Sequence, residues 1–427
     1  MKQTQSFVAE KFYNNEQIFE IVRKTVFPEL EGKKKILLIP PDITRFYAKA
    51  GLIAGYIYDN FKDKATVHVI PALGSHLRMT DEEHEMLFGT VIPSEQILHH
   101  NWRKDTIRLG EVPASYVKEL SEGKMDEDID ISINHLLADG GYDYILSLGQ
   151  VVPHEIVGLA NYSKNIFVGL GGASMIDATH FLSAVYGVER ILGRADTPVR
   201  KVFDYAENKM REQGILVNYL LTVVTRFDDN NEVNGIFFGT ERDAFEQAAV
   251  LSQKYNINYV DKPLKKVVVY MQPEEFRSTW VGNKAIYRTR MAIADGGELL
   301  ILAPGIATLG EDETMNNVLN HHGYHTTEEI LKIMETPEGK DLCDNRGVAS
   351  HMILSTSDNR FKITYALKSL DAQTIENARF NWVNFDDVVT KYDPTKLKDG
   401  YNTVDGEEIY FISNPALGLW ADKSRFN

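Results

Sequence analysis

The segment from Gly149 to Phe181 gathers residue types that can do chemistry: His154 behind a proline, Lys164, and His180 behind a glycine cluster. Imidazole titrates near neutral pH, so it can exchange a proton, and in its neutral form it binds transition metals. A lysine that enters a buried segment is paired, reaches water or is used covalently. The segment therefore has groups for proton transfer, covalent attachment and metal ligation, with a purely structural role as the alternative for each.

Three more polar residues follow apolar runs nearer the N-terminus. Asp42 and Arg45 come directly after the run KILLI, and His76 follows the next apolar run in PALGSH. An arginine at a strand end can hold a carboxylate or phosphate through two parallel hydrogen bonds, and a histidine there suits a general base. The alternatives are an Asp42–Arg45 pair within one helical turn and a histidine that caps the following helix.

The remaining histidine clusters are weaker candidates. His99 and His100 are adjacent, as are His321 and His322, and His325 follows closely. No acidic residue completes an H-E-x-x-H pattern around them, so we expect structural or exposed side chains. The glycine cluster at 169–172 is neither a Walker A loop nor a dinucleotide fingerprint.

Alternating strands and helices must position these side chains. Apolar runs bounded by glycine or proline predict buried strands at 34–42, 65–74, 142–150 and 164–172. Helical patterns lie between them at 50–63 and 80–89, the latter opening with a Thr80–Glu83 capping box. This alternation predicts an α/β fold with mainly parallel sheets, in which ligands bind at the carboxyl ends of the strands.

The length of 427 residues suggests two domains. A second β–α–β pattern begins near residue 262, with strands at 265–273 and 298–305 around a helix at 280–294. We therefore expect an N-terminal α/β catalytic and cofactor-binding domain at 1–261 and a smaller α/β domain at 262–405. Residues 406–427 are a candidate for a return to the first domain. The active site is expected in the cleft between the domains.

Composition narrows the functional class. The net charge is −15 without a dense basic block, which argues against nucleic acid as a partner. A single cysteine, Cys343, rules out an intrachain disulfide framework and fits a reducing cytoplasm. The N-terminus lacks the apolar core of a secretory signal, and no apolar run is long enough to span a membrane. We expect a cytoplasmic protein.

Together, these motifs resemble one family, the nickel-dependent lactate racemases and related 2-hydroxyacid racemases and epimerases. The resemblance rests on D-x-T-R at 42–45, G-[ST]-H at 74–76 and G-x-V-x-P-H at 149–154. Lys164 and His180 follow at family-like spacing. Five polar positions in the family order are far more specific than any one of them.

The resemblance implies a nickel-pincer nucleotide, a pyridinium thioamide/thiocarboxylate mononucleotide, attached covalently to Lys164. His180 would be the protein ligand of the nickel ion. Asp42, Thr44 and Arg45 would lie near the cofactor and substrate. Separate maturation proteins would be needed to make the cofactor.

The same resemblance implies that His76 and His154 are an acid/base pair on opposite faces of the substrate. Hydride removal from a 2-hydroxy acid, with proton removal from its hydroxyl, gives a planar 2-keto acid. Return of hydride to the other face inverts the configuration. Arg45 would anchor the substrate carboxylate.

Two departures from the family pattern bear on the loop geometry and the substrate. Before Lys164 the family often has Ser-Gly-Gly, where this chain has 161–163 as Asn-Tyr-Ser. In the second domain the lactate-type Tyr-Gln-x-x-Lys becomes Trp280, Val281 and, after two residues, Lys284. Trp280 and Lys284 remain candidates for substrate contact. The lost polar group predicts a substrate other than lactate, such as a longer 2-hydroxy acid or a sugar acid.

Two alternatives belong to other classes. One is a non-catalytic relative that binds a hydroxy acid or nucleotide without a nickel centre. The other is a metallohydrolase that uses His99, His100 and His321. Covalent mass on Lys164, and the effects of replacing His180 or His100, distinguish them.

Overall fold

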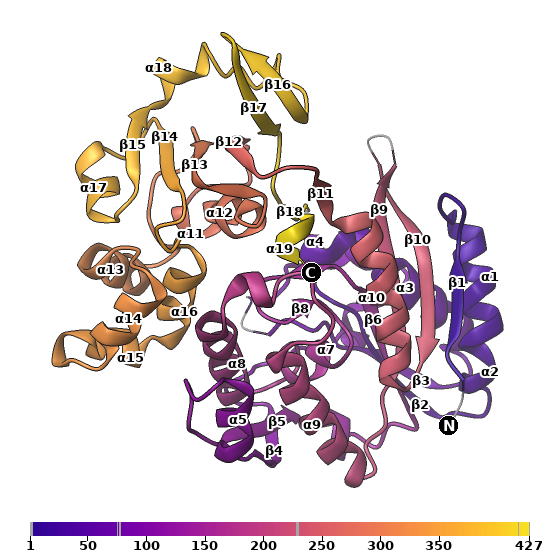
Figure 1. Cartoon of the computed structure of the whole chain (residues 1–427). Coiled ribbons are helices and arrows are strands. Elements are labelled where there is room, and N and C mark those ends of the chain that lie inside the picture. Colours follow the sequence, from indigo (N-terminus) through magenta and orange to yellow (C-terminus); the bar gives the residue numbers. More distant parts are fainter. Residues whose placement is uncertain (1–2, 75, 77, 228–229, 417, 427) are drawn as a thin grey trace. The chain divides into compact units, whose positions relative to one another are not determined.

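The computed structural model describes residues 3–74, 76, 78–227, 230–416 and 418–426. It divides into two compact units, unit 1 (Met1–Leu182 and Leu192–Tyr255) and unit 2 (Ser183–Ile191 and Asn256–Asn427). Ser75 of the predicted G-[ST]-H motif lies outside the described residues. Both units are α/β, which confirms the predicted fold class (Figure 1).

Unit 1 is built on a six-stranded sheet. In spatial order its strands are β1 (Gln5–Val8), β10 (Asn230–Gly239), β9 (Asn218–Phe227), β6 (Tyr144–Gln150), β2 (Lys35–Ile39) and β3 (Thr66–Val69). The four strands from β9 to β3 are parallel, and β10 and β1 extend the sheet antiparallel. The central strands are buried almost throughout, as expected for parallel strands covered on both faces.

Helices surround this sheet, and two predicted helices are confirmed. The helices are α1 (Asn15–Thr25), α2 (Phe27–Leu30), α3 (Ala50–Phe61), α4 (Asp81–Phe88), α5 (Ala114–Leu120), α6 (Leu136–Asp139), α7 (Ser163–Phe167), α8 (Ala173–Tyr186), α9 (Pro198–Glu212) and α10 (Arg242–Asn256). The Thr80–Glu83 capping box opens α4 as predicted. Two small antiparallel ribbons complete the unit: β4 (Thr106–Val112) with β5 (Ile129–Asn134), and β7 (Pro153–His154) with β8 (Gly158–Leu159).

The strand predicted at 164–172 is wrong, because the segment begins with the short helix α7. A short buried apolar run has no periodicity that separates helix from strand. Close packing explains the glycines that follow: a Cβ atom on Gly171 would lie 1.9 Å from the carbonyl oxygen of Phe167. β9 therefore takes the place beside β6 in the sheet.

Unit 2 has a second six-stranded sheet. Its order is β15 (Asn381–Asn384), β14 (Lys362–Leu367), β13 (Ile293–Leu302), β12 (Leu264–Tyr270), β17 (Glu407–Ile412) and β16 (Gly400–Val404). All neighbours are parallel except the edge pair β16–β17. The tail 406–427 lies in this unit, where β17 pairs with β12 and β18 (Trp420–Asp422) pairs with β11 (Asn258–Val260).

The helix predicted at 280–294 is shorter and interrupted in unit 2. The segment forms α11 (Thr279–Gly282) and α12 (Lys284–Thr289), which meet at the buried residue Asn283. The other helices are α13 (Glu313–His322), α14 (Thr327–Met334), α15 (Lys340–Asp344), α16 (Arg346–Leu354), α17 (Ala372–Asn377), α18 (Phe385–Val389) and α19 (Lys423–Phe426). Within the described part of the chain, no helix has the length and apolar character needed to cross a membrane.

Candidate active site

Three of the predicted site residues follow neighbouring parallel strands of unit 1. Asp42 comes after β2, His76 after β3 and His154 after β6. An isolated parallel bridge between Pro41 and Ala72 keeps the first two chain segments together beyond their strands. The carboxyl edge of the sheet therefore presents these groups together, as expected for parallel α/β sheets.

Asp42 and His76 form a direct pair. The Oδ2 atom of Asp42 lies 2.5 Å from Nδ1 of His76, and its Oδ1 atom accepts hydrogen bonds from the backbone N–H and hydroxyl of Thr44. Burial alone would raise the pKa of Asp42, but the His76 and Thr44 contacts outweigh it and lower the pKa. An ionised carboxylate only accepts, so Nδ1 of His76 carries the proton and Nε2 is free to take another.

His154 is held in the opposite tautomer. Its Nδ1 accepts a hydrogen bond of 3.1 Å from the backbone N–H of Ile156, which leaves the ring proton on Nε2. Burial lowers the pKa of His154 well below its usual value, so the imidazole is neutral at physiological pH. In this state His76 presents a proton acceptor and His154 presents a proton donor.

Lys164 is the second residue of α7, behind a strained turn. Asn161 has φ 66° and Tyr162 has φ 55°, the left-handed region that favours glycine. In the Ser-Gly-Gly pattern, Asn161 stands in place of the serine and the bulky Tyr162 in place of the first glycine. The side chain of Asn161 offsets part of the strain, because it accepts from the Tyr162 N–H and donates to the Leu148 carbonyl.

Arg200 of α9 stabilises this turn through hydrogen bonds from its guanidinium. Its guanidinium donates to the carbonyl oxygens of Leu159 (2.7 Å) and Asn161 (3.4 Å) and to the hydroxyl of Ser163 (2.8 Å). It also lies over the ring of Phe245, 4.2 Å from the centroid. Burial lowers the pKa of Arg200 to about 10. A buried cation therefore fixes the three residues that lead into Lys164.

The Lys164 amine is poised for covalent use. Burial, then the charge of Arg45 and, more weakly, the charge of Arg200 lower its pKa to about 8 against the opposing effects of Glu155 and Asp42. A large neutral fraction near pH 8 is what a nucleophilic amine requires. The amine is thus within electrostatic range of both Arg45 and the Asp42–His76 pair.

His180 is oriented as a metal ligand would be. On α8, its Nδ1–H donates to the carbonyl oxygen of Ile176 at 2.5 Å, so the neutral ring keeps a lone pair on Nε2. Burial lowers the pKa of His180, and the Lys164 charge lowers it further. The charge of His180 in turn helps to lower the pKa of His154. The structure therefore brings His154, Lys164 and His180 into one electrostatic neighbourhood.

These residues fit the group that the sequence suggested. A weakly basic amine at Lys164 can form an acyl-type link, and a neutral imidazole at His180 offers a nitrogen to a soft divalent metal. The cation Arg45 suits the negative charge of a nucleotide phosphate. The donor set therefore supports a tethered, metal-bearing nucleotide at this position.

Sequence reasoning missed two residues of this neighbourhood, Arg200 and Glu155. Arg200 stands with Phe203, Glu207 and Met210 on a buried face of α9, so helical spacing would have marked a charge among core residues. Glu155 follows His154 directly, and its charge opposes the lowered pKa of both His154 and Lys164. No spacing rule separates Glu155 from an ordinary surface glutamate.

The predicted substrate residues of unit 2 surround Asn283. Trp280 stacks on His351 with ring centroids 3.7 Å apart and planes 24° apart. The side-chain nitrogen of Asn283 lies 3.3 Å from Nε2 of His351, and its side-chain oxygen accepts a hydrogen bond of 2.7 Å from the Tyr365 hydroxyl. Lys284 begins α12 immediately afterwards and is half-buried. This cluster fixes the Trp280 ring within unit 2.

The histidines of the metallohydrolase alternative have other partners. His100 lies 3.1 Å from the Gly171 carbonyl oxygen through Nε2 and 3.0 Å from the Asn134 amide through Nδ1. His99 stacks on His84, and burial lowers the pKa of each. Among the described residues, neither His99 nor His100 belongs to a group of three His, Cys, Asp or Glu side chains whose ligand atoms lie close enough to share a metal ion.

Comparisons with known proteins agree with this geometry. Residues 15–190 match the model of the lactate racemase N-terminal domain. No curated protein matches the sequence at a significant level.

Two solved structures share the fold across nearly the whole chain. A Thermotoga maritima protein is 24% identical, with a TM-score of 0.79, over 98% of this chain and 100% of that one. The lactate racemase apoprotein of Thermoanaerobacterium thermosaccharolyticum is 18% identical, with a TM-score of 0.71, over 97% and 94% of the two chains. The α/β architecture of both units is therefore that of the lactate racemase structure.

Proposed function

We propose that this protein is a racemase or epimerase of a 2-hydroxy acid that carries a nickel-pincer nucleotide on Lys164. The observation that carries the proposal is that a weakly basic Lys164 amine lies within electrostatic range of the neutral imidazoles of His154 and His180. The N-terminal family match and the Asp42–His76 pair support the same function.

Lys164 and His180 are the residues that would hold the cofactor. The amine would provide the covalent tether, and Nε2 of His180 would provide a ligand to nickel. When bound, the group supplies an electrophilic ring that accepts hydride. Arg200 keeps the tethering turn in place through its bonds to Leu159 and Asn161.

The proton chemistry falls to His76 and His154. Nε2 of His76 takes the substrate hydroxyl proton, and Asp42 stabilises the resulting imidazolium through Nδ1. His154 offers its Nε2–H to a substrate oxygen. To act as the base for the opposite enantiomer, its ring would first move the proton from Nε2 to Nδ1 and give up the contact with the Ile156 N–H. Arg45 binds the substrate carboxylate with two parallel hydrogen bonds. This division follows from the tautomers that Asp42 and Ile156 impose.

The substrate differs from lactate in this proposal. Trp280 and Val281 replace the tyrosine and glutamine of the lactate-type pattern, and the Trp280 ring is fixed on His351. Lys284 remains as a cation for a second polar group. A longer 2-hydroxy acid or a sugar acid suits an aromatic face and a lysine better than the methyl group of lactate does.

The deciding experiment is intact mass after coexpression with nickel and cofactor maturation proteins. We expect a cofactor-sized increment on Lys164 in the wild type and none in Lys164→Arg, which keeps a cation but loses the amine. Exposed Lys118, changed in the same way, is the matched control. A wild-type chain without added mass, or an increment that survives Lys164→Arg, would overturn the assignment.

Activity on a panel of hydroxy acids in heavy water tests the chemistry. Hydride transfer retains the substrate C2 hydrogen, whereas proton abstraction replaces it with deuterium. His76→Ala and His154→Ala should each stop turnover while the Lys164 mass increment remains. Deuterium at C2, or normal rates in either variant, would contradict the proposed roles. Val281→Gln should improve lactate turnover if this position faces the substrate.

A further inference from the structure

Unit 2 contains a cluster of metal-binding groups that the proposed reaction does not use. His321 and His322 are the last two residues of α13, and Asp341 is in α15. Nδ1 of His321 lies 3.0 Å from Oδ2 of Asp341, and Nε2 of His322 lies 2.7 Å from Oδ1. One carboxylate thus meets two imidazoles that are adjacent in the sequence.

The geometry of this cluster is that of a ligand set. One ligand atom from each of the three residues lies within 4.8 Å of the others. The two rings are 4.2 Å apart at their centroids and tilted by 40°, so different ring nitrogens point to the same carboxylate. Among the described residues, no other group of three such side chains lies this close together.

The surroundings favour a cation. The His322 side chain is only 6% exposed, so its ring is not an ordinary solvated histidine, whereas His321 at 59% leaves one side open to water. The cluster also lies at the C-terminus of α13, which is capped by Gly323, and the negative end of the helix dipole attracts positive charge. A partly buried nitrogen, an open side and a helix C-terminus together suit an ion that keeps water ligands.

We propose that His321, His322 and Asp341 form a second metal site that binds a divalent first-row transition ion such as Zn²⁺. Two imidazoles and one carboxylate are a common set for these ions, with the remaining positions filled by water. The site is separate from Lys164 and His180 and does not depend on the proposed function. Metal replaces the protons on the two nitrogens and links α13 to α15.

The competing explanation is a plain polar contact, in which the Asp341 carboxylate accepts a hydrogen bond from each ring. That contact also joins α13 to α15, but it needs no metal and gains nothing from one. A metal bound there stabilises the folded chain in proportion to its concentration relative to its dissociation constant. The two explanations therefore differ in stoichiometric binding and in metal-dependent stability.

The test is Zn²⁺ titration of the full chain in the presence of a competing chelator, with melting temperature as the second readout. The chain carries His180→Ala in every sample, so that the proposed active site adds no zinc binding through that ligand. We expect one Zn²⁺ per chain and a rise in melting temperature. Asp341→Asn and His321→Asn should each weaken binding by more than about tenfold, since even second-shell changes cost about that much.

Asp344→Asn is the matched control, because Asp344 is on the same helix and pairs with Lys340. It should bind Zn²⁺ like the parent chain. His321 is exposed, so His321→Asn tests the site without disturbing the packing of α13. The proposal is overturned if no saturable binding occurs at micromolar zinc, or if binding is the same in Asp341→Asn, His321→Asn and Asp344→Asn.

Discussion

Unit 1 buries Arg200 and unit 2 buries Arg288 and Arg290, and Arg200 and Arg290 have different kinds of partner. Arg200 in unit 1 donates to two backbone carbonyls and a serine hydroxyl, and within the described residues it hydrogen-bonds no carboxylate. Arg290 in unit 2, with a side chain 4% exposed, contacts the carboxylates of Glu189 and Asp358 at 2.9 and 3.0 Å. One cation is held by dipoles, and the other by opposite charges.

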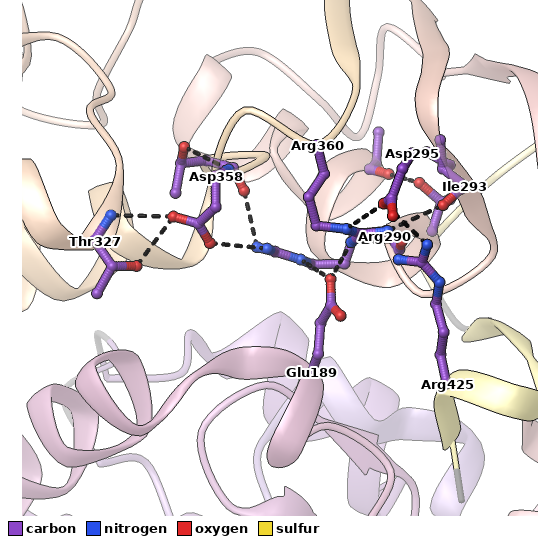
Figure 2. A network of polar contacts seen from close by, with 11 residues as sticks. Glu189, Arg290, Ile293, Asp295, Thr327, Asp358, Arg360 and Arg425 are labelled. Atoms are coloured by element: carbon purple, nitrogen blue, oxygen red, sulfur yellow. Dashed lines mark hydrogen bonds and ion pairs between the residues drawn. The ribbon is translucent and has the colours of Figure 1, made fainter.

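The unit 2 arrangement is a network (Figure 2). Glu189 also accepts from Arg360, which donates in addition to Asp295 at 2.9 Å, and Arg425 reaches the same Asp295 oxygen at 2.9 Å. Glu189 belongs to the segment Ser183–Ile191, which the sequence placed in the first domain and which the structure places in unit 2. The network accounts for that placement, because two arginines of unit 2 bind this one carboxylate.

The different partners of Arg200 and Arg290 imply different roles for the two charges. A compensated network stabilises a fold and leaves little field around it. The two terminal nitrogens of Arg200 donate to carbonyl and hydroxyl oxygens, which do not cancel its charge, so the charge acts on Lys164 and helps to lower its pKa. Arg200 therefore has two roles, as a brace for the turn and as a source of positive potential.

Arg200→Met should have the largest effect on unit 1. The carbonyl oxygens of Leu159 and Asn161 would lose their donors in a buried position, at about 1–3 kcal/mol each, so we expect about 3–5 kcal/mol less stability for this region. The left-handed turn would relax and the Lys164 tether would be lost. Hydrogen exchange of residues 158–168 and intact mass after maturation measure the two effects.

Arg200→Lys is the informative companion, because it keeps a cation but has one nitrogen where the guanidinium used two. We expect partial stability with little cofactor loading. Full loading in Arg200→Met would show that the turn holds itself without the brace.

Glu189→Gln should have the largest effect on unit 2, although it is smaller than that of Arg200→Met. The amide keeps the shape but loses the charge that two arginines share, while Arg290 still has Asp358 and the Thr356 carbonyl. We expect a loss of about 1–3 kcal/mol in unit 2. Hydrogen exchange of β13 and α12 should report it, and the Lys164 pKa should not change.

The pH dependence of Lys164 tests the comparison directly. Acylation of the cofactor-free chain should rise through a midpoint near pH 8, against 10.5 for an ordinary lysine. Arg200→Gln removes a positive charge that disfavours the protonated amine, so the midpoint should move up. Arg290→Gln is the matched control and should leave it unchanged. Mass spectrometry of the Lys164 peptide gives each midpoint.

The lowered pKa of Lys164 also predicts the direction in which the free energy of unfolding changes with pH. Between about pH 8 and 10.5 the unfolded chain keeps a proton on Lys164 that the folded chain has released. The free energy of unfolding therefore gains from this group as pH rises through that window. A fall in this contribution over the window would mean that the buried amine is charged.

Much of the site was predictable, because it lies where strands end. Asp42, His76 and His154 follow β2, β3 and β6, and apolar runs with glycine or proline stops mark those strands in the sequence. Arg200 and Glu189 were not predictable in the same way. Their partners are backbone carbonyls or side chains far away in the chain, and no local spacing encodes such contacts.

The segment at 164–172 shows the limit more sharply. Its composition is that of a buried strand, yet a left-handed turn at Asn161 and Tyr162 directs the chain into α7. Asparagine is only a weak sequence signal for positive φ and tyrosine is none, since the surrounding bonds impose it. A glycine at position 162, as in the Ser-Gly-Gly pattern, would have been a stronger signal, and this chain has tyrosine there.

The strain in that turn can be measured with one pair of variants. Both variants, Asn161→Ala and Asn161→Gly, remove the hydrogen bonds that the side-chain amide makes to Tyr162 and Leu148. They therefore differ only in the conformational free energy of holding residue 161 at a φ of 66°. The glycine variant should be more stable by about 1 kcal/mol. At exposed Val250, within α10, the same pair should show the opposite order by about 1 kcal/mol. Chemical denaturation of the four variants gives both differences.

Equal stability of the Asn161 pair would mean that the turn gives up its left-handed geometry once the amide is gone. Asn161, rather than Arg200, would then be the residue that sets the entry into Lys164.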